Sequence, residues 1–418
     1  MDPTLTTGRI LLDVAVILVA ARAGSLLFER FGQPGVIGEL AAGVLLGPTL
    51  LGALPGDPSS ALFPADAMAV LRQIGQLGLV LFMFTVGWDL DLRLVRRRGR
   101  AAATVSVAST LVPFALGLAL AVHLHDEHGS IAGVPVPFWP FALFVGASLA
   151  VTAFPVLARI LRDTGLAETQ LGALVLSAAA VDDIVGWTAL AVALTVLEAG
   201  GPWDYARMFL ETALFVVVVV VVVRPLLQRL LRGATPSREL LLVPMALGGA
   251  YLTETIGIHA AFGAFLVGAA MPRHDTDAAL GEIRRRLSHV SALLVPIYFV
   301  TSGMMVDISG LEQGDLADLM LILAAACAGK FLGAFGGARL ARVGARESAA
   351  IGVMMNTRGV IEIILLTVGR EHGLIDDRLF TLLALMAIIT TLLTSPLLRA
   401  IAPVVPDRAL AQRNRRRP

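Results

Sequence analysis

The chain has 418 residues, of which 56% are hydrophobic and only 16% are charged, and its mean hydropathy is +0.80. The formal net charge of +1 excludes nothing by itself, but the charges cluster between apolar runs of about 20 residues, the length that crosses the hydrocarbon core of a bilayer. This composition excludes a soluble globular protein and predicts an all-α polytopic membrane protein surrounded by a lipid bilayer, with no nucleic-acid partner.

Thirteen apolar segments, separated by charged or Pro- and Gly-rich breaks, are predicted to form transmembrane helices. In chain order they are residues 10–29, 35–54, 67–87, 100–124, 138–162, 168–197, 206–231, 238–256, 258–272, 288–306, 316–340, 347–370 and 378–402. The first segment is too long for the apolar region of a signal peptide and lacks a convincing cleavage site, so we expect a helix there as well.

Arginine placement predicts the orientation of these helices. Arginines follow the third, fifth, seventh, ninth and eleventh segments and occur in the short basic tail, residues 403–418. The alternate loops 52–66, 125–137 and 307–315 contain neither arginine nor lysine. By the positive-inside rule the N-terminus lies outside and the C-terminus in the cytoplasm, which agrees with an odd number of helices.

Two sequence patterns recur seven segments apart. GVIGELAAGVLLGP in segment 35–54 matches HAAFGAFLVGAAMP in segment 258–272, and FMFTVGWDLD matches YFVTSGMMVD one segment later in each case. An odd displacement reverses the direction of the chain across the membrane. The sequence therefore predicts two inverted repeats of six helices joined by a linker helix over 206–231, an architecture typical of secondary transporters.

Two helices in corresponding positions of the repeats carry residues that interrupt a helix. Pro155 in VTAFPVLARI removes a backbone donor, and MNTRGVIEII puts polar residues and a glycine inside an apolar segment. Each pattern alone is compatible with a proline kink or a snorkelling arginine, but together they predict paired broken helices. The predicted breaks comprise Ala153, Phe154 and Pro155 in the first helix and Asn356, Thr357, Arg358 and Gly359 in the second.

The polar groups at the two breaks have predicted roles. Carbonyl groups freed there, with the hydroxyls of Thr152 and Thr357, are suited to coordinating a hard cation. Arg358 and Glu362 are four residues apart on one helix face, so we expect a structural ion pair between them.

Adjacent aspartates, Asp182 and Asp183, lie in the middle of the apolar segment 168–197. A charge at a helix centre costs roughly 2.5–3.5 kcal/mol, so these carboxylates call for a function or a partner. Neighbouring side chains on a helix point about 100° apart, so we expect one carboxylate to face a transport cavity and the other a partner. Lys330, the single lysine of the chain, is the candidate partner, since a buried lysine can release its proton whereas an arginine stays charged.

Motifs of enzyme chemistry are missing from the sequence: it has no zinc-ligand spacing, no GxSxG and no phosphate-binding loop. An intramembrane aspartyl protease also buries two aspartates, but adjacent positions on one helix cannot converge on one water molecule. We therefore expect no enzyme and no cofactor. A receptor, a channel and a sodium- or proton-coupled symporter of organic solutes are the remaining alternatives to exchange.

The motifs TAFPVLARIL, AAAVDDIVGW, GIHAAFGAFLVG, FVTSGMMVDI and NTRGVIEIILL occur in an order that resembles the cation:proton antiporter-2 family over essentially the whole chain. The resemblance implies a single transmembrane domain over 1–418 with a sodium/proton antiporter-like fold, in a homodimer in the bacterial inner membrane. It also implies a scaffold over about 9–88 and 238–306 and a mobile core over about 100–197 and 316–402.

The same resemblance assigns roles to the charged residues. It implies that Asp183 binds the monovalent cation or the proton, assisted by Thr152, and that Asp182 pairs with Lys330. The Asp-Asp form favours a sodium exchanger over a potassium efflux system, with K⁺ or Li⁺ as alternative substrates. Many members also carry a nucleotide-binding domain, which we do not expect in this chain.

Overall fold

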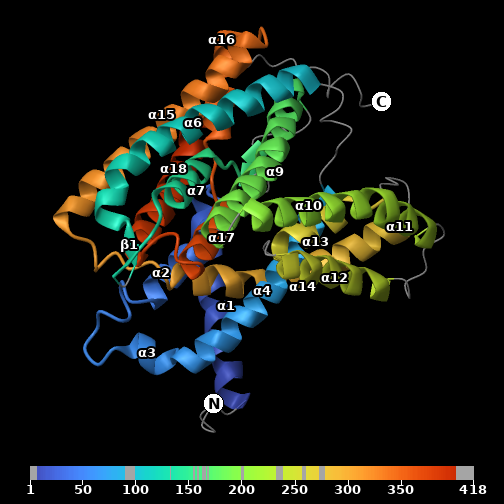
Figure 1. Ribbon diagram of the computed structural model, residues 1–418. Helices are drawn as coiled ribbons and strands as arrows, with labels where there is room; N and C mark the ends of the chain where they lie inside the picture. The colour runs from blue at the N-terminus through green and yellow to red at the C-terminus, as the bar shows by residue number, and fades with distance from the viewer. Residues whose placement is uncertain are drawn as a thin grey trace. The chain divides into compact units, whose positions relative to one another are not determined.

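The computed structural model describes residues 7–89, 99–131, 133–153, 156–157, 160–161, 166, 169–198, 202–231, 239–256, 260–272 and 278–401. These residues are mostly helical (Figure 1). Their contacts divide the chain into two compact units, the first made of residues 1–28, 35–91 and 191–310 and the second of residues 29–34, 92–190 and 311–418.

The first unit contains most of the helices near the N-terminus and in the middle of the chain. They are α1 (Thr7–Arg30), α2 (Gly35–Leu46), α3 (Pro58–Leu62), α4 (Ala65–Asp89), α10 (Pro202–Val218), α12 (Glu239–Ile256), α13 (Ala260–Ala269) and α14 (Ala278–Gly303). The predicted linker consists of α10, a π-helical stretch η1 (Val219–Val223) and α11 (Arg224–Leu230). Ile17, Leu71, Ile297 and Val300 form part of an apolar core between α1, α4 and α14.

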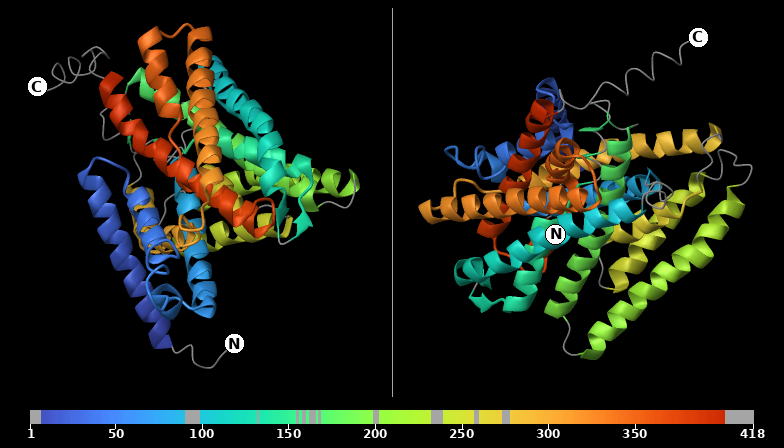
Figure 2. Two further views of the ribbon diagram at one scale, coloured as in Figure 1. Left: turned by 90° about the vertical axis from the view of Figure 1, so that its left-hand side faces the viewer. Right: turned by 90° about the horizontal axis from the view of Figure 1, so that it is seen from above.

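The second unit contains α6 (Gly99–His128), α7 (Phe138–Ala150), α9 (Gln170–Glu198), α15 (Gln313–Leu340), α16 (Ala345–Met355), α17 (Val360–Glu371) and α18 (Asp377–Ile401). The two long helices α6 and α15 run side by side (Figure 2). The division of the chain into a scaffold and a core stays a prediction, and the first unit also includes the predicted linker. That one of them moves against the other stays a prediction.

Glycine contacts of the same kind occur twice within the first unit. A Cβ atom on Gly38 of α2 would lie 2.1 Å from the carbonyl oxygen of Gly24 in α1, and one on Gly263 of α13 would lie 2.0 Å from that of Gly249 in α12. Gly38 and Gly263 are each followed by a second glycine five residues later, Gly43 and Gly268, in the two matching sequence patterns. The α1–α2 pair therefore packs as closely as the α12–α13 pair, because glycine lets the backbones touch.

The structure differs from the sequence prediction in several elements. Helix α14 begins at Ala278 rather than residue 288, because Glu282 forms ion pairs with Arg285 and Arg286 that stabilise helical turns outside the apolar stretch. Helix α2 ends at Leu46, two residues before Pro48, instead of continuing to residue 54.

Two short elements in the connecting segments were not predicted. Helix α3 follows an N-cap formed by Asp57, whose side chain accepts a hydrogen bond from Ser60 N. The strands β1 (Ser130–Ile131) and β2 (Val134–Pro135) form a small antiparallel pair after α6. Among the described residues six helices are long and apolar enough to cross a membrane, and further apolar helical stretches have 10–17 residues, so the count of thirteen stays a prediction.

Candidate functional site

Helix α9 carries Asp182 into the interior of the second unit, where the residue is 1% exposed. Three hydroxyl groups on α6 lie within hydrogen-bond distance of its carboxylate. Oδ1 accepts from Ser106 Oγ at 2.6 Å and from Thr110 Oγ1 at 3.1 Å. Ser109 Oγ lies 3.2 Å from Oδ2 and 3.0 Å from the carbonyl oxygen of Ser106, and its single proton goes to one of the two at a time. Hydrogen bonds of this kind replace the water that the charged group loses on burial.

Lys330 supplies the opposite charge from the middle of α15. Its side chain is fully buried, and its Nζ lies 3.0 Å from Asp182 Oδ2. The same ammonium group donates to Thr152 Oγ1 at 2.7 Å. Because the carboxylate and the ammonium group neutralise each other, the pair can stay inside an apolar unit at a much lower cost than either charge alone.

Thr152 links this ion pair to both predicted breaks. Its hydroxyl accepts from Lys330 and lies 2.9 Å from Asp182 Oδ2 and 3.1 Å from the carbonyl oxygen of Met355. A hydroxyl has a single proton, so Thr152 donates to one of these two acceptors at a time. Thr152 thus connects the ion pair to the carbonyl group of Met355, where α16 ends.

The chain leaves the helical conformation at two places that contact each other. Helix α7 ends at Ala150 and continues into extended backbone from Val151, while α16 ends at Met355 and α17 begins at Val360. The backbone N–H of Ala153 donates to the carbonyl oxygen of Thr357 at 2.9 Å. The four residues between α16 and α17 are those at which the sequence predicts a break, and Phe154 and Pro155 lie outside the described residues.

Arg358 connects the two interrupted segments. Its buried guanidinium group donates to the carbonyl oxygens of Ser148 and Leu149 at 2.6 Å each and to Glu362 Oε1 at 3.0 Å. The last carbonyls of α7 have no partner within their own helix and carry the negative end of its dipole. Arg358 thus caps α7 from the second break, in addition to pairing with Glu362 as expected.

Of the predicted site residues, the structure brings together Asp182, Lys330 and Thr152. Asp183 follows Asp182 in α9, but its side chain lies outside the described residues. The hydroxyls of Ser106, Ser109 and Thr110 were missed by the sequence analysis. The sequence does contain a pattern that could have identified them, since Ser109 and Thr110 follow Ser106 by three and four residues and so share one face of α6 with it.

A buried carboxylate–ammonium pair beside two contacting breaks, in an apolar and mostly helical chain, is typical of ion-coupled secondary transporters. Residues 15–402 match the family described as "Sodium/hydrogen exchanger, transmembrane". The chain belongs to this family. It is an integral, multi-pass membrane antiporter that exchanges cations for protons, and not an enzyme.

Curated relatives resemble the chain over nearly its whole length. The Na(+)/H(+) antiporter NhaS4 of Synechocystis sp. is 39% identical, with 94% of this chain and 97% of the relative covered. Cation/H(+) antiporter 20 of Arabidopsis thaliana is 35% identical, and K(+)/H(+) antiporter 1 of Saccharomyces cerevisiae is 31% identical, each over 94% of this chain. The chain spans about half the length of these two, 48% and 46%.

The fold also matches a solved structure. The sodium proton antiporter MjNhaP1 from Methanocaldococcus jannaschii superimposes with a TM-score of 0.67 at 16% sequence identity, with 99% of this chain and all of that chain covered. At this identity the likeness concerns the fold alone.

Proposed function

We propose that the protein exchanges Na⁺ for protons across the bacterial plasma membrane, and that the two ions compete for the carboxylate of Asp183. The observation that carries this assignment is the 3.0 Å ion pair between Lys330 and Asp182. Asp182 is neutralised by Lys330 and occupied by hydroxyl donors, whereas Asp183 is the adjacent carboxylate on the same helix. Asp183 is therefore the group left to exchange a proton for a cation.

Further oxygen ligands for the cation come from the second break. Thr357 is fully buried and Asn356 is 9% exposed, and neither Thr357 Oγ1 nor Asn356 Oδ1 has a hydrogen-bond partner among the described residues. Buried oxygens without partners are costly, and hydroxyl and amide oxygens are ligands that hard cations accept. We infer that these two oxygens face the transported cation together with Asp183.

Coupling follows from the cost of burying a charge. A carboxylate that carries a proton or a cation is neutral, while a bare carboxylate would pay roughly 2.5–3.5 kcal/mol in the hydrocarbon region. Only the occupied carrier then changes the side to which it opens, so every cation that crosses is matched by proton movement in the opposite direction. In this proposal the second unit moves as the core, and the first unit forms the scaffold of a homodimer.

Reconstituted proteoliposomes that contain a pH-sensitive dye test the assignment. Addition of Na⁺ should move protons across the membrane in the parent protein, and Asp183→Asn should reduce this signal to that of empty vesicles. Asp66→Asn, which changes an exposed aspartate in the first turn of α4, should keep the parental rate. Full activity of Asp183→Asn would overturn the assignment.

The same vesicles distinguish the substrates. We expect Na⁺ to give the largest rate, with Li⁺ next and K⁺ weakest, because the Asp-Asp form favours a sodium exchanger. A larger rate with K⁺ would assign the chain to K⁺/H⁺ exchange, the activity in the name of the yeast relative. A protein in which no cation produces a proton signal would contradict cation/proton exchange itself.

A further inference from the structure

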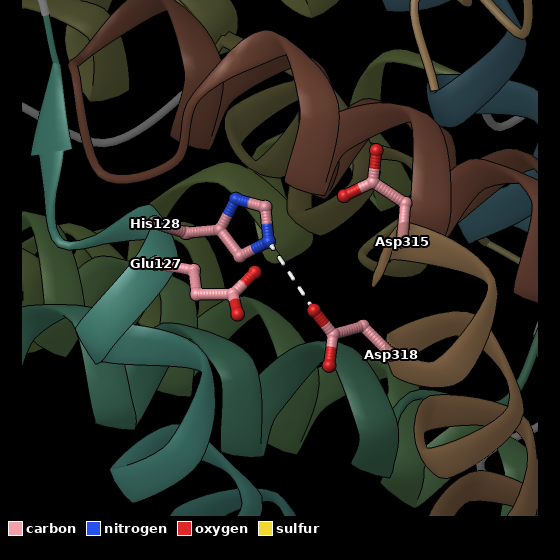
Figure 3. Close-up of side chains that lie close together, drawn as sticks. All are labelled: Glu127, His128, Asp315 and Asp318. Carbon is pink, nitrogen blue, oxygen red and sulfur yellow. Dashed lines mark ion pairs between the residues drawn. The ribbon is translucent and has the colours of Figure 1, made fainter. Parts of the chain in front are cut away.

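A second cluster of charged side chains lies in the second unit, where α6 ends and α15 begins. Glu127, His128, Asp315 and Asp318 each offer one ligand atom, and these four atoms lie within 4.8 Å of one another (Figure 3). None of these residues belongs to the Asp182–Lys330 site. We propose that this cluster is a binding site for a divalent transition-metal ion of the Zn²⁺ class.

His128 is the residue that points to a metal. It is 1% exposed, and its Nε2 has no hydrogen-bond partner among the described residues. That nitrogen faces Asp318, with 3.9 Å between Nε2 and Oδ2 (Figure 3). This separation is too long for a hydrogen bond and close to the about 3.4 Å expected between two ligand atoms of a tetrahedral ion with bonds of 2.0–2.2 Å.

The other ring nitrogen of His128 has the partner that metal-binding histidines usually have. Nδ1 lies 2.9 Å from Asp376 Oδ2, and Asp376 is itself held by a hydrogen bond from Leu379 N to Oδ1 at 2.7 Å. Donation from Nδ1–H to a carboxylate leaves Nε2 with a free lone pair and fixes the orientation of the ring. The imidazole is thus prepared to bind a cation through Nε2.

Charge around the ring favours a divalent cation. Asp315 is occupied by Arg378, whose Nη2 lies 2.6 Å from Oδ1, so Asp315 neutralises a cation already present. Asp318 is buried and accepts from His123 Nε2 at 2.9 Å, and Glu127 is exposed beside it. His128, Asp318 and Glu127 are therefore the proposed ligands, and their two carboxylates match the charge of the ion.

The kind of ligand selects the class of metal. An imidazole nitrogen with two carboxylates suits Zn²⁺, Co²⁺ or Ni²⁺, whereas Mg²⁺ and Ca²⁺ prefer sites made of oxygen alone. Bound at this place, the ion would join the last turn of α6 to the first turns of α15. These helices also carry the hydroxyls and the lysine that surround Asp182.

Titration of the purified full chain, prepared without a histidine tag, tests the proposal. Co²⁺ should give a visible absorption band that saturates at one ion per chain, and Zn²⁺ but not Mg²⁺ should abolish the band. His128→Gln should weaken Zn²⁺ binding at least tenfold, and Glu127→Gln should weaken it several-fold. His289→Gln, which changes an exposed histidine on α14, is the matched control and should bind like the parent.

Two results would overturn the proposal. The first is that the parent protein binds Co²⁺ no more strongly than His128→Gln does. The second is that Glu127→Gln and Asp318→Asn both bind Zn²⁺ as strongly as the parent protein. Glu127 is exposed, so its substitution leaves the interior intact. If His128→Gln fails to fold, Zn²⁺ binding by Glu127→Gln therefore still tests the proposed site. Either result would assign the cluster to helix packing alone.

Discussion

At the scale of single residues, Asp182 has the surroundings of a fixed anchor. Its two oxygens accept from Ser106, Ser109, Thr110 and Lys330, and Thr152 is a further donor within reach. A carboxylate has about four lone-pair positions, so a transported cation would have to displace an existing donor. In the proposed mechanism the cation is bound by the neighbouring carboxylate of Asp183 instead, which would account for the two adjacent aspartates.

Removal of one partner from this pair should destabilise the protein strongly. Lys330→Gln leaves Asp182 buried without a counter-charge, and we expect a loss of about 3–5 kcal/mol in the free energy of unfolding. In the double variant Asp182→Asn/Lys330→Gln no charge is left without a partner, so most of the loss should be recovered. Unfolding of the three variants in detergent, combined in a double-mutant cycle, measures the coupling. If the losses from the two substitutions simply add in the double variant, the predicted coupling between Asp182 and Lys330 is contradicted.

The ion pair could be expected from the sequence, but its hydroxyl donors could not. Lys330 is conspicuous as the single lysine in a chain that otherwise uses arginine, and it lies in the middle of an apolar segment. Serines and threonines such as Ser106 are common in membrane helices, where they often bond to the carbonyl of the preceding turn. Only the packing of α6 against α9 selects those that reach Asp182, and this contact joins residues 76 apart.

At the scale of elements, the interruption of a helix requires a cap from elsewhere in the chain. The sequence predicted the Arg358–Glu362 pair because the two residues are four apart. It could not predict that Arg358 also donates to Ser148 and Leu149, because these contacts join residues 210 and 209 positions apart in the sequence. Arg358 therefore holds both breaks in one arrangement, with Thr391 bonded to its backbone on the other side.

Close helix packing in the first unit predicts which glycines tolerate a methyl group. Gly263→Ala should destabilise the protein by about 1–3 kcal/mol, because the added Cβ meets the backbone oxygen of Gly249 at 2.0 Å and α13 must shift. Gly248→Ala is the matched control in α12, where a Cβ meets nothing within 4 Å. Thermal unfolding in detergent measures both effects.

The equivalent position in the other half extends this comparison. Gly38→Ala should cost about as much as Gly263→Ala, since a Cβ there would lie 2.1 Å from the carbonyl oxygen of Gly24. Equal losses would support the repeat that the two sequence patterns predict. A Gly263→Ala protein as stable as Gly248→Ala would mean that α12 and α13 are not in close contact.

At the scale of the whole molecule, hydropathy predicts the membrane class and the order of the helices, but not where each helix ends. The ends depend on groups outside the apolar stretch, as the ion pairs of Glu282 at the start of α14 show. Family membership likewise follows from motifs spread over the chain. The side from which each ion enters depends instead on orientation, for which the sequence offers a single argument, the placement of arginine.

Orientation can be measured with single cysteines in a Cys327→Ser background. Ser309 lies in the arginine-free loop 307–315 and Ala345 at the start of α16 beside arginines, and both are exposed. A thiol reagent that does not cross membranes should label Ser309→Cys in intact cells, and should label Ala345→Cys only after permeabilisation. This pattern follows if the arginine-rich connections stay in the cytoplasm. The reverse pattern would mean that the protein has the opposite orientation. The His128 cluster, whose Glu127 and His128 lie in the last turn of α6 within the arginine-free stretch 125–137, would then meet cytoplasmic rather than external metal ions.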